Sequence, residues 1–214
     1  MGEATRRITR IEPQKKNEKR LNVYLDGCFA FGLDEGVALA HHLHEGDALN
    51  ECAIDKILRT EEKSKAKQKG LSLLSYRPRS TEEFKKKLLE KGFSENTVAD
   101  VIDDFLRVGL LNDGEFALAL ARSKMDYRPM AKRLLMRELF LKGINGDVAD
   151  KVIEDVYEGL TEVEVARRLV RKRTERYKGD SRIRKRITDF LVRRGFHWDV
   201  INEALREEEW EQEH

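Results

Sequence analysis

The densest run of chemically distinctive side chains is a stretch of cations late in the chain. Residues 165–194 hold thirteen Lys or Arg against three acids, a net charge of +10 in a chain that totals +2. Clustered cations bind polyanions by releasing their counterions. The window predicts a contact with nucleic acid or an acidic protein surface, and the alternative is a solvated face balanced by acids elsewhere. Its candidate binding residues are Arg167, Arg168, Arg171, Lys172, Arg173, Arg176, Arg182, Arg184, Lys185, Arg186, Arg193 and Arg194.

A second, weaker cluster consists of Lys85, Lys86 and Lys87, preceded by Arg77 and Arg79. These lysines could extend a basic track. Consecutive residues point to most sides of a helix, so at least one of them is expected only to face solvent.

The sequence lacks the motifs of common enzyme classes. It contains no Gly-x-x-x-x-Gly-Lys phosphate loop, no Gly-x-Gly-x-x-Gly dinucleotide fingerprint after a strand and no Gly-x-Ser-x-Gly nucleophile elbow. We therefore predict a protein that is not an enzyme and that has no catalytic residues and no cofactor.

Metal binding is not indicated either. His41, His42 and His44 lie close together but lack the third or fourth partner that zinc requires, and Cys28 and Cys52 lack paired spacing. Two distant cysteines suit a reducing compartment. With no apolar run of about 18–20 residues and no signal-peptide core, we expect a cytoplasmic protein without a membrane span.

The elements that must position the cations follow an internal repeat. The frame begins Tyr76-Arg77-Pro78, returns as Tyr127-Arg128-Pro129 and returns more loosely as Tyr177-Lys178-Gly179. Each copy closes on a glycine between a cation and an apolar residue, and these glycines (92, 143 and 195) lie 51 and then 52 residues apart. Such a period is typical of stacked helical units. Because the tyrosine recurs at one frame position, we expect it to make a structural contact between helices.

Each unit has the pattern of three helices: one that ends at the tyrosine, one that ends at the glycine and one that closes the unit. In the first unit, Ser80 with Glu83 forms a capping box and Gly92 marks a left-handed stop. We therefore predict a mainly α fold of three tandem three-helix repeats in an elongated, curved array. The predicted domains are repeat 1 (53–113), repeat 2 (114–161) and repeat 3 with an acidic tail (162–214).

The first 52 residues predict a small β-hairpin and helix module. Asp26-Gly27 supplies the turn of a type I′ hairpin between 21–25 and 28–31. Alternation across this turn predicts one face with Leu21, Val23, Leu25 and Ala30 and another with Tyr24, Phe29 and Phe31. We expect a third strand near residues 8–11 and a short helix over residues 36–42.

The C-terminal residues 207–214 carry five glutamates and one tryptophan. Three roles are open for this acidic tail. It could fold back and screen the basic repeat, remain solvated or bind a basic groove on a partner.

The order and spacing of these motifs closely resemble the RecX family over residues 60–206. The resemblance rests on the Tyr-Arg-Pro-Arg-Ser to Lys-Gly-Phe frame, on Gly109-Leu110-Leu111-Asn112-Asp113 at the end of the first block and on Lys142-Gly143-Ile144. The family comprises bacterial regulators of the RecA recombinase. The resemblance implies a non-enzymatic protein that docks along the groove of a RecA filament on single-stranded DNA and modulates its assembly, ATP hydrolysis and strand exchange.

Two other functions are compatible with the same residues. One is a sequence-independent DNA-binding protein that acts through repeat 3, on single- or double-stranded DNA. The other is a helical scaffold whose acidic tail docks on an unrelated protein. In each case we expect a monomer.

Overall fold

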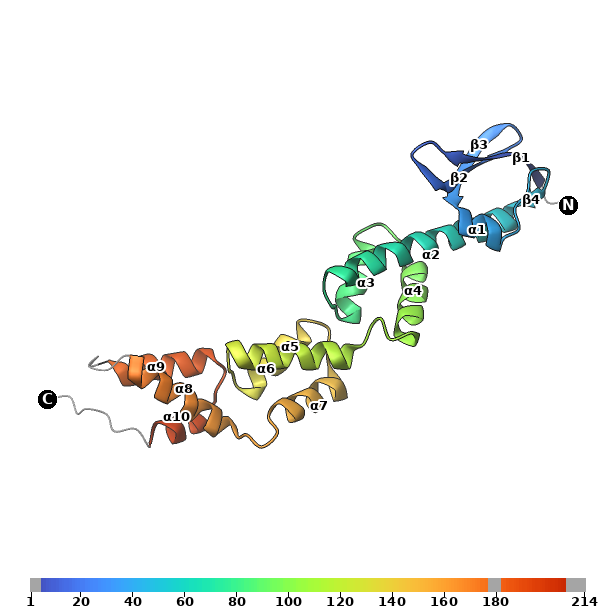
Figure 1. Ribbon diagram of the computed structural model, residues 1–214. Coiled ribbons are helices and arrows are strands. Elements are labelled where there is room, and N and C mark those ends of the chain that lie inside the picture. The colour runs from blue at the N-terminus through green and yellow to red at the C-terminus, as the bar shows by residue number, and fades with distance from the viewer. Residues whose placement is uncertain (1–4, 177–181, 207–214) are drawn as a thin grey trace. The chain divides into compact units, whose positions relative to one another are not determined.

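The computed structural model describes residues 5–176 and 182–206, so the third frame tyrosine, Tyr177, lies outside the described residues. The mainly helical fold class is confirmed (Figure 1). The chain divides into two compact units. Unit 1 comprises Met1–Pro78 with Phe84–Leu110, and unit 2 comprises Arg79–Glu83 with Leu111–His214.

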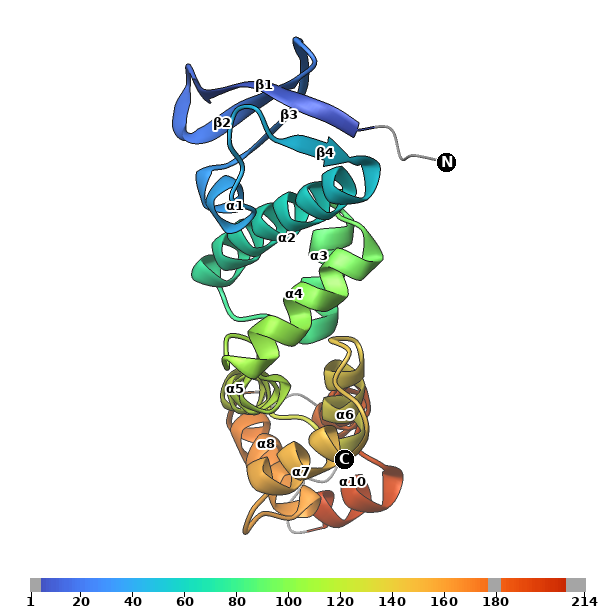
Figure 2. The ribbon, with the colours of Figure 1, turned by 90° about the vertical axis from the view of Figure 1, so that its right-hand side faces the viewer.

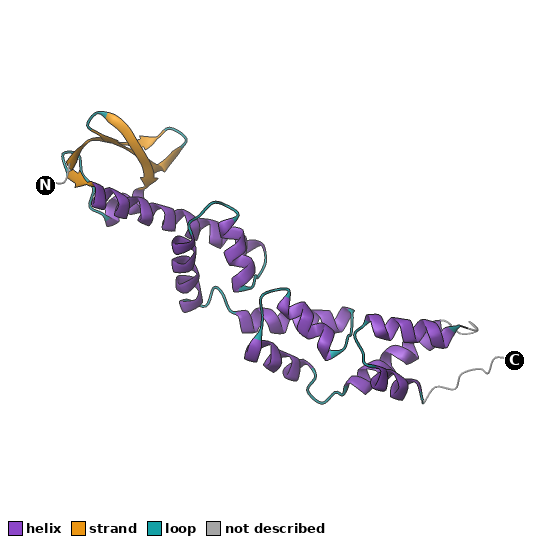
Figure 3. Cartoon of the chain, turned by 180° about the vertical axis from the view of Figure 1, so that it is seen from behind, coloured by secondary structure: helices purple, strands orange, loops and turns teal. Residues whose placement is uncertain are grey.

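The strands of the described chain gather in the N-terminal module (Figure 3). They form one antiparallel sheet in the order β3-β2-β1-β4. The short helix α1 (Glu35–Ala40) and the start of α2 (Glu51–Tyr76) lie against one side of this sheet (Figure 2). The strands are β1 (Thr5–Gln14), β2 (Asn17–Leu25), β3 (Cys28–Asp34) and β4 (Ala48–Asn50).

The hairpin turn is confirmed, because Asp26 and Gly27 both have positive φ (51° and 83°) and Leu25 pairs with Cys28. The prediction for Phe31 is wrong. The register shifts after Tyr24 and Phe29, so that Phe31 pairs with Val23 and Ala30 becomes the extra residue of a bulge. Phe31 therefore joins the buried core, while Phe29 remains 58% exposed on the outer face.

The buried carboxylate of Glu61 joins the sheet to α2. Its Oε1 lies 2.8 Å from Arg20 Nη2 on β2, and its Oε2 accepts a hydrogen bond of 2.7 Å from the Asp34 amide. Only 3% of Glu61 is exposed, and a buried acid is stable when it is both paired and hydrogen-bonded.

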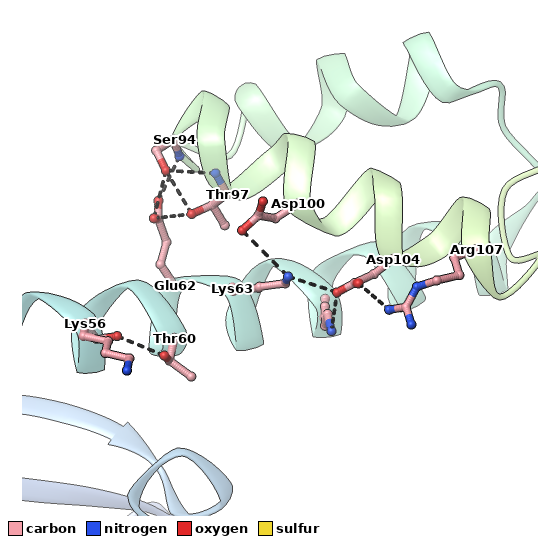
Figure 4. Close-up of polar contacts among 10 residues, drawn as sticks. Lys56, Thr60, Glu62, Lys63, Ser94, Thr97, Asp100, Asp104 and Arg107 are labelled. Atoms are coloured by element: carbon pink, nitrogen blue, oxygen red, sulfur yellow. Dashed lines mark hydrogen bonds and ion pairs between the residues drawn. The ribbon is translucent and has the colours of Figure 1, made fainter. Parts of the chain in front are cut away.

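Polar contacts also attach α4 (Glu95–Arg107) to α2 (Figure 4). Glu62 accepts hydrogen bonds from the Ser94 amide at 2.8 Å, the Ser94 hydroxyl at 2.9 Å and the Thr97 hydroxyl at 2.6 Å. Nearer the helix end, Asp104 binds Lys67, Lys63 and Arg107, which hold the pKa of this carboxyl well below its usual value. Between the two helices, α3 (Thr81–Leu89) buries Phe84 and Leu88.

Six helices form most of unit 2, and a continuous apolar core runs through repeats 2 and 3. Leu135 and Leu139 belong to the same buried cluster as Ile187 and Leu191. The helices are α5 (Asp113–Tyr127), α6 (Lys132–Phe140), α7 (Gly146–Val156), α8 (Glu162–Arg176), α9 (Ile183–Arg193) and α10 (Trp198–Leu205).

The frame glycines end the middle helices as predicted, with φ of 86° at Gly92, 78° at Gly143 and 84° at Gly195. Gly195 has a second role. A methyl group placed on it would lie 2.7 Å from the Cβ of Leu134, which is on the first turn of α6, whereas nothing lies within 4 Å of the same position at Gly92. The adjacent carbonyl of Arg194 accepts a 2.9 Å hydrogen bond from the Ala131 amide. The backbone of repeat 3 is therefore bonded directly to the start of α6 in repeat 2.

The structure contains a contact of the predicted capping box between Ser80 and Glu83. The Glu83 amide donates to Ser80 Oγ at 3.1 Å, as expected, and the Ser80 hydroxyl donates to the Lys142 carbonyl at 2.5 Å. The Glu83 carboxylate accepts from Lys142 Nζ at 3.1 Å. The residue before Gly143 is therefore bound to segment 79–83 of unit 2, much as the residue before Gly195 is bound to the start of α6.

We expect the Gly195→Ala substitution to destabilise the protein more than Gly159→Ala. Gly159 also lies in unit 2 with positive φ (70°) but has nothing near its missing side chain. Backbone strain should cost about 1–2 kcal/mol in both variants. Overpacking against Leu134 should add about 1–3 kcal/mol in Gly195→Ala alone. Urea unfolding followed by circular dichroism measures the difference, and equal losses would contradict the close contact.

We expect Glu62→Gln to lower the free energy of unfolding by about 1–2 kcal/mol at neutral pH, because a charged acceptor of three hydrogen bonds is lost. Burial raises the pKa of Glu62, but the hydrogen bonds from Thr97 and Ser94 outweigh it and hold the pKa below its usual value. The stabilisation should therefore be present above the unfolded pKa, near 4.5, and disappear as the pH falls through the folded value. The exposed Glu95→Gln on α4 is the control, and a gap from wild type that persists in acid would count against this role.

Candidate functional site

Helical periodicity sorts the cations of α8 onto different faces. Arg168, Lys172 and Arg176 follow one another at intervals of four residues and line a groove together with Arg173. Arg167 instead faces α10, where its Nη2 lies 3.5 Å from Glu203 Oε1. Arg171 is exposed and is absent from the groove lining.

The groove has a volume of about 880 Å³ and lies entirely within unit 2. Its walls come from the ends of α5 and α7, from one face of α8 and from the end of α9. Its cations are Arg122, Arg168, Lys172, Arg173, Arg176 and Arg194. The lining acids are Asp126, Asp155 and Glu175, so the cations exceed the acids by three.

Arg194 is held by a hydrogen bond and by an aromatic contact. Its Nη1 donates to the Pro129 carbonyl at 2.6 Å, and its guanidinium carbon lies 4.6 Å from the ring centre of Phe190. Arg173 approaches the same ring at 3.9 Å. Cation–π contacts of this kind fix the planes of both guanidinium groups at the groove.

The charged form of Arg194 is disfavoured at the groove. Burial, followed by the charges of Arg128 and Arg173, lowers the pKa of Arg194. A bound anion would relieve this repulsion, since an opposite charge within a few ångströms favours the charged form of each guanidinium. The groove is therefore electrostatically suited to an anionic ligand.

The cations of α9 lie elsewhere. Arg184, Lys185 and Arg193 are exposed and, with Arg182 and Arg186, do not line the groove. Of the twelve residues predicted in this window, the groove brings together five: Arg168, Lys172, Arg173, Arg176 and Arg194.

The three lysines of α3 belong to unit 1 and not to the groove. Lys85 and Lys86 are exposed, whereas Lys87 Nζ lies 2.6 Å from Glu90 Oε2. At least one member of this run therefore forms an ordinary ion pair on its own helix.

Arg122 was not predicted, and the prediction for the frame tyrosines Tyr76 and Tyr127 differs from the structure. Arg122 lies outside the charged window, and only its position on the last turns of α5, near the frame, could have indicated it. The structural contact predicted for the tyrosines is wrong: Tyr76 is 85% and Tyr127 is 89% exposed. Tyr76 and Tyr127 are each the last residue of a helix, two residues before a proline, and Tyr127 lies at the groove.

Other kinds of site have little support among the described residues. No group of three His, Cys, Asp or Glu side chains there could hold a metal ion, and His41 Nε2 lies 2.9 Å from the hydroxyl of Thr60. Within residues 5–176 and 182–206, no helix combines the length and apolar character needed to cross a bilayer.

Comparison with known proteins identifies the module and all three helical repeats. Residues 6–50 match the N-terminal domain of the regulatory protein RecX, and residues 66–105, 112–153 and 161–205 match its first, second and third three-helix domains.

Relatives and solved structures agree. RecX regulatory proteins of Bacillus licheniformis and Clostridioides difficile are each 32% identical, over 95% and 92% of this chain and 78% and 93% of their own lengths. A crystal structure of a regulatory protein RecX is 28% identical, with a TM-score of 0.70 over 94% of this chain and all of the other. RecX from Lactobacillus salivarius is 27% identical, with a TM-score of 0.58 over 69% of this chain and 97% of the other. The shared domain order and the identity along almost the whole sequence lead to one conclusion: this chain belongs to the RecX family of regulatory proteins.

Proposed function

We propose that this protein binds the RecA filament on single-stranded DNA and regulates its assembly, ATP hydrolysis and strand exchange. The observation that carries the proposal is the groove of repeats 2 and 3, where cations on α5, on α8 and at the end of α9 face one space. Family membership supplies the regulatory role. The groove supplies a means of holding a polyanion or an acidic protein surface.

The regulation that we propose depends on binding and not on chemistry. The protein would act as a cytoplasmic monomer without a cofactor and would change the filament by occupying it. Cations exposed on α9, among them Arg184, Lys185 and Arg193, would extend the contact beyond the groove. The lysines of α3 would form a lesser contact.

A second candidate function is sequence-independent DNA binding. It is favoured by the same exposed cations of α9, because phosphates along a backbone can be contacted without a shaped pocket. The two functions differ in what the protein prefers at a fixed salt concentration. Tighter binding to RecA on single-stranded DNA than to naked DNA supports the first, and equal affinities support the second.

We expect increasing amounts of this protein to change the rate of DNA-dependent ATP hydrolysis by RecA until the effect saturates. Saturation is expected because the filament offers a limited number of binding sites. The assay measures phosphate release at constant RecA and DNA concentrations. A steady rate at saturating protein would count heavily against filament regulation.

We expect Lys172→Glu to weaken filament binding about tenfold or more, and Arg171→Glu to weaken it far less. The two substitutions change the net charge equally on adjacent residues, but only Lys172 lines the groove. If Lys172 contacts one phosphate, its reversal should also reduce the slope of log affinity against log salt by about 0.9. Equal losses in the two variants would mean that net charge matters and the groove does not.

A further inference from the structure

The groove is more than a cationic surface, because part of its lining is apolar. Met125, Val156, Leu160 and Leu169 contribute to it beside the arginines. A phosphate backbone would use the cations and leave these side chains uncovered. An acidic peptide with one large apolar residue would satisfy both, since a buried aromatic side chain is the usual anchor of a peptide in a groove.

The chain itself contains a segment of this composition. Residues 207–214 read Glu-Glu-Glu-Trp-Glu-Gln-Glu-His, which combines five acids with Trp210. This segment lies outside the described residues. Its charge is opposite to that of the groove, and its tryptophan matches the apolar lining.

The described chain ends on α10, which packs against α8, the helix whose other face lines the groove. Glu203 of α10 lies 3.5 Å from Arg167, and the next residue of α8, Arg168, already lines the groove. Eight residues reach roughly 26–29 Å when extended. The groove face of α8 rises about 12 Å from Arg168 to Arg176, and a helix is about 10–12 Å across. The segment is therefore long enough to pass around α8 and enter the groove.

We propose that residues 207–214 occupy the groove of repeats 2 and 3 and mask its cations. The glutamates pair with Arg168, Lys172 and their neighbours, and Trp210 covers the apolar lining. Because segment and groove are joined by a short tether, their effective concentration is about millimolar, so a weak contact suffices. The consequence for regulation rests on the proposed function: a filament must displace the segment before it binds.

The contact is tested with tryptophan fluorescence and without RecA. The sequence has two tryptophans, so Trp198→Phe leaves Trp210 as the only one, and Trp198 is 57% exposed and tolerates the change. At low salt, the emission of Trp210 should lie to the blue of that of the free peptide 207–214. It should move to the peptide value in about 1 M salt, where the screening length falls to about 3 Å.

Matched charge reversals locate the contact. Adding Lys172→Glu with Arg168→Glu to the Trp198→Phe chain should move the emission to the peptide value at low salt, while Arg171→Glu should leave it unchanged. Circular dichroism checks that the variants are folded. Emission equal to that of the free peptide in the unreversed chain overturns the proposal, as does emission that the groove variants leave unchanged.

Masking is measured with heparin as a polyanion probe. Replacing the five glutamates of 207–214 by glutamine should strengthen heparin binding about threefold to tenfold in the chain that has Lys172, and little in Lys172→Glu with Arg168→Glu. An equal gain in both backgrounds would reflect net charge and overturn masking. If these assays detect the contact but the protein has no effect on RecA, the proposed function is wrong and the contact stands. If the protein regulates RecA but these assays detect no contact, only the contact is wrong.

Discussion

The close approach of Gly195 to the first turn of α6 is the constraint on which the site depends. A side chain at this position would collide with Leu134, and the carbonyl of Arg194 binds the Ala131 amide. The glycine therefore fixes where repeat 3 meets repeat 2. Because Arg194 precedes it, the same contact holds the Arg194 guanidinium beside Phe190 and the Pro129 carbonyl. The contact that packs repeat 3 against repeat 2 therefore also positions the Arg194 guanidinium.

That placement brings like charges together. Arg194 lies near Arg173 and Arg128, and burial and these charges lower its pKa. Aromatic stacking and a carbonyl acceptor compensate in part, and an anionic ligand would compensate further. The groove therefore offers an anion more local positive charge than the net charge of +2 suggests. Local geometry, and not overall composition, produces this concentration of charge.

The sequence predicted the periodic features well, because spacing alone determines them: the frame glycines, the hairpin turn and the helical stripes. The predictions from the sequence were wrong where a single residue changes the face on which its neighbours lie. The bulge at Ala30 moved Phe31 into the core, and three-residue β4 was too short to leave a pattern. The sequence showed the cationic window, but it did not show which of these cations face the groove and which face away from it. Whether Lys172 or Arg171 faces the groove depends on which side of α8 packs against α10.

The repeats differ in the residues that surround the cation before each frame glycine, at Lys142 and at Arg194. Counting five residues from each frame proline reaches Glu83 after Pro78 and Leu134 after Pro129. Lys142, before Gly143, pairs with Glu83 at 3.1 Å, so its charge is neutralised where the segment 79–83 meets α6. Arg194 holds the same frame position before Gly195, but Leu134 stands at the position of Glu83, and Arg194 lines the groove. With leucine in place of the acid, the cation before the glycine lines the groove. The carbonyl of that cation is still bound by the preceding repeat, through the Ala131 amide at Arg194 and through the Ser80 hydroxyl at Lys142.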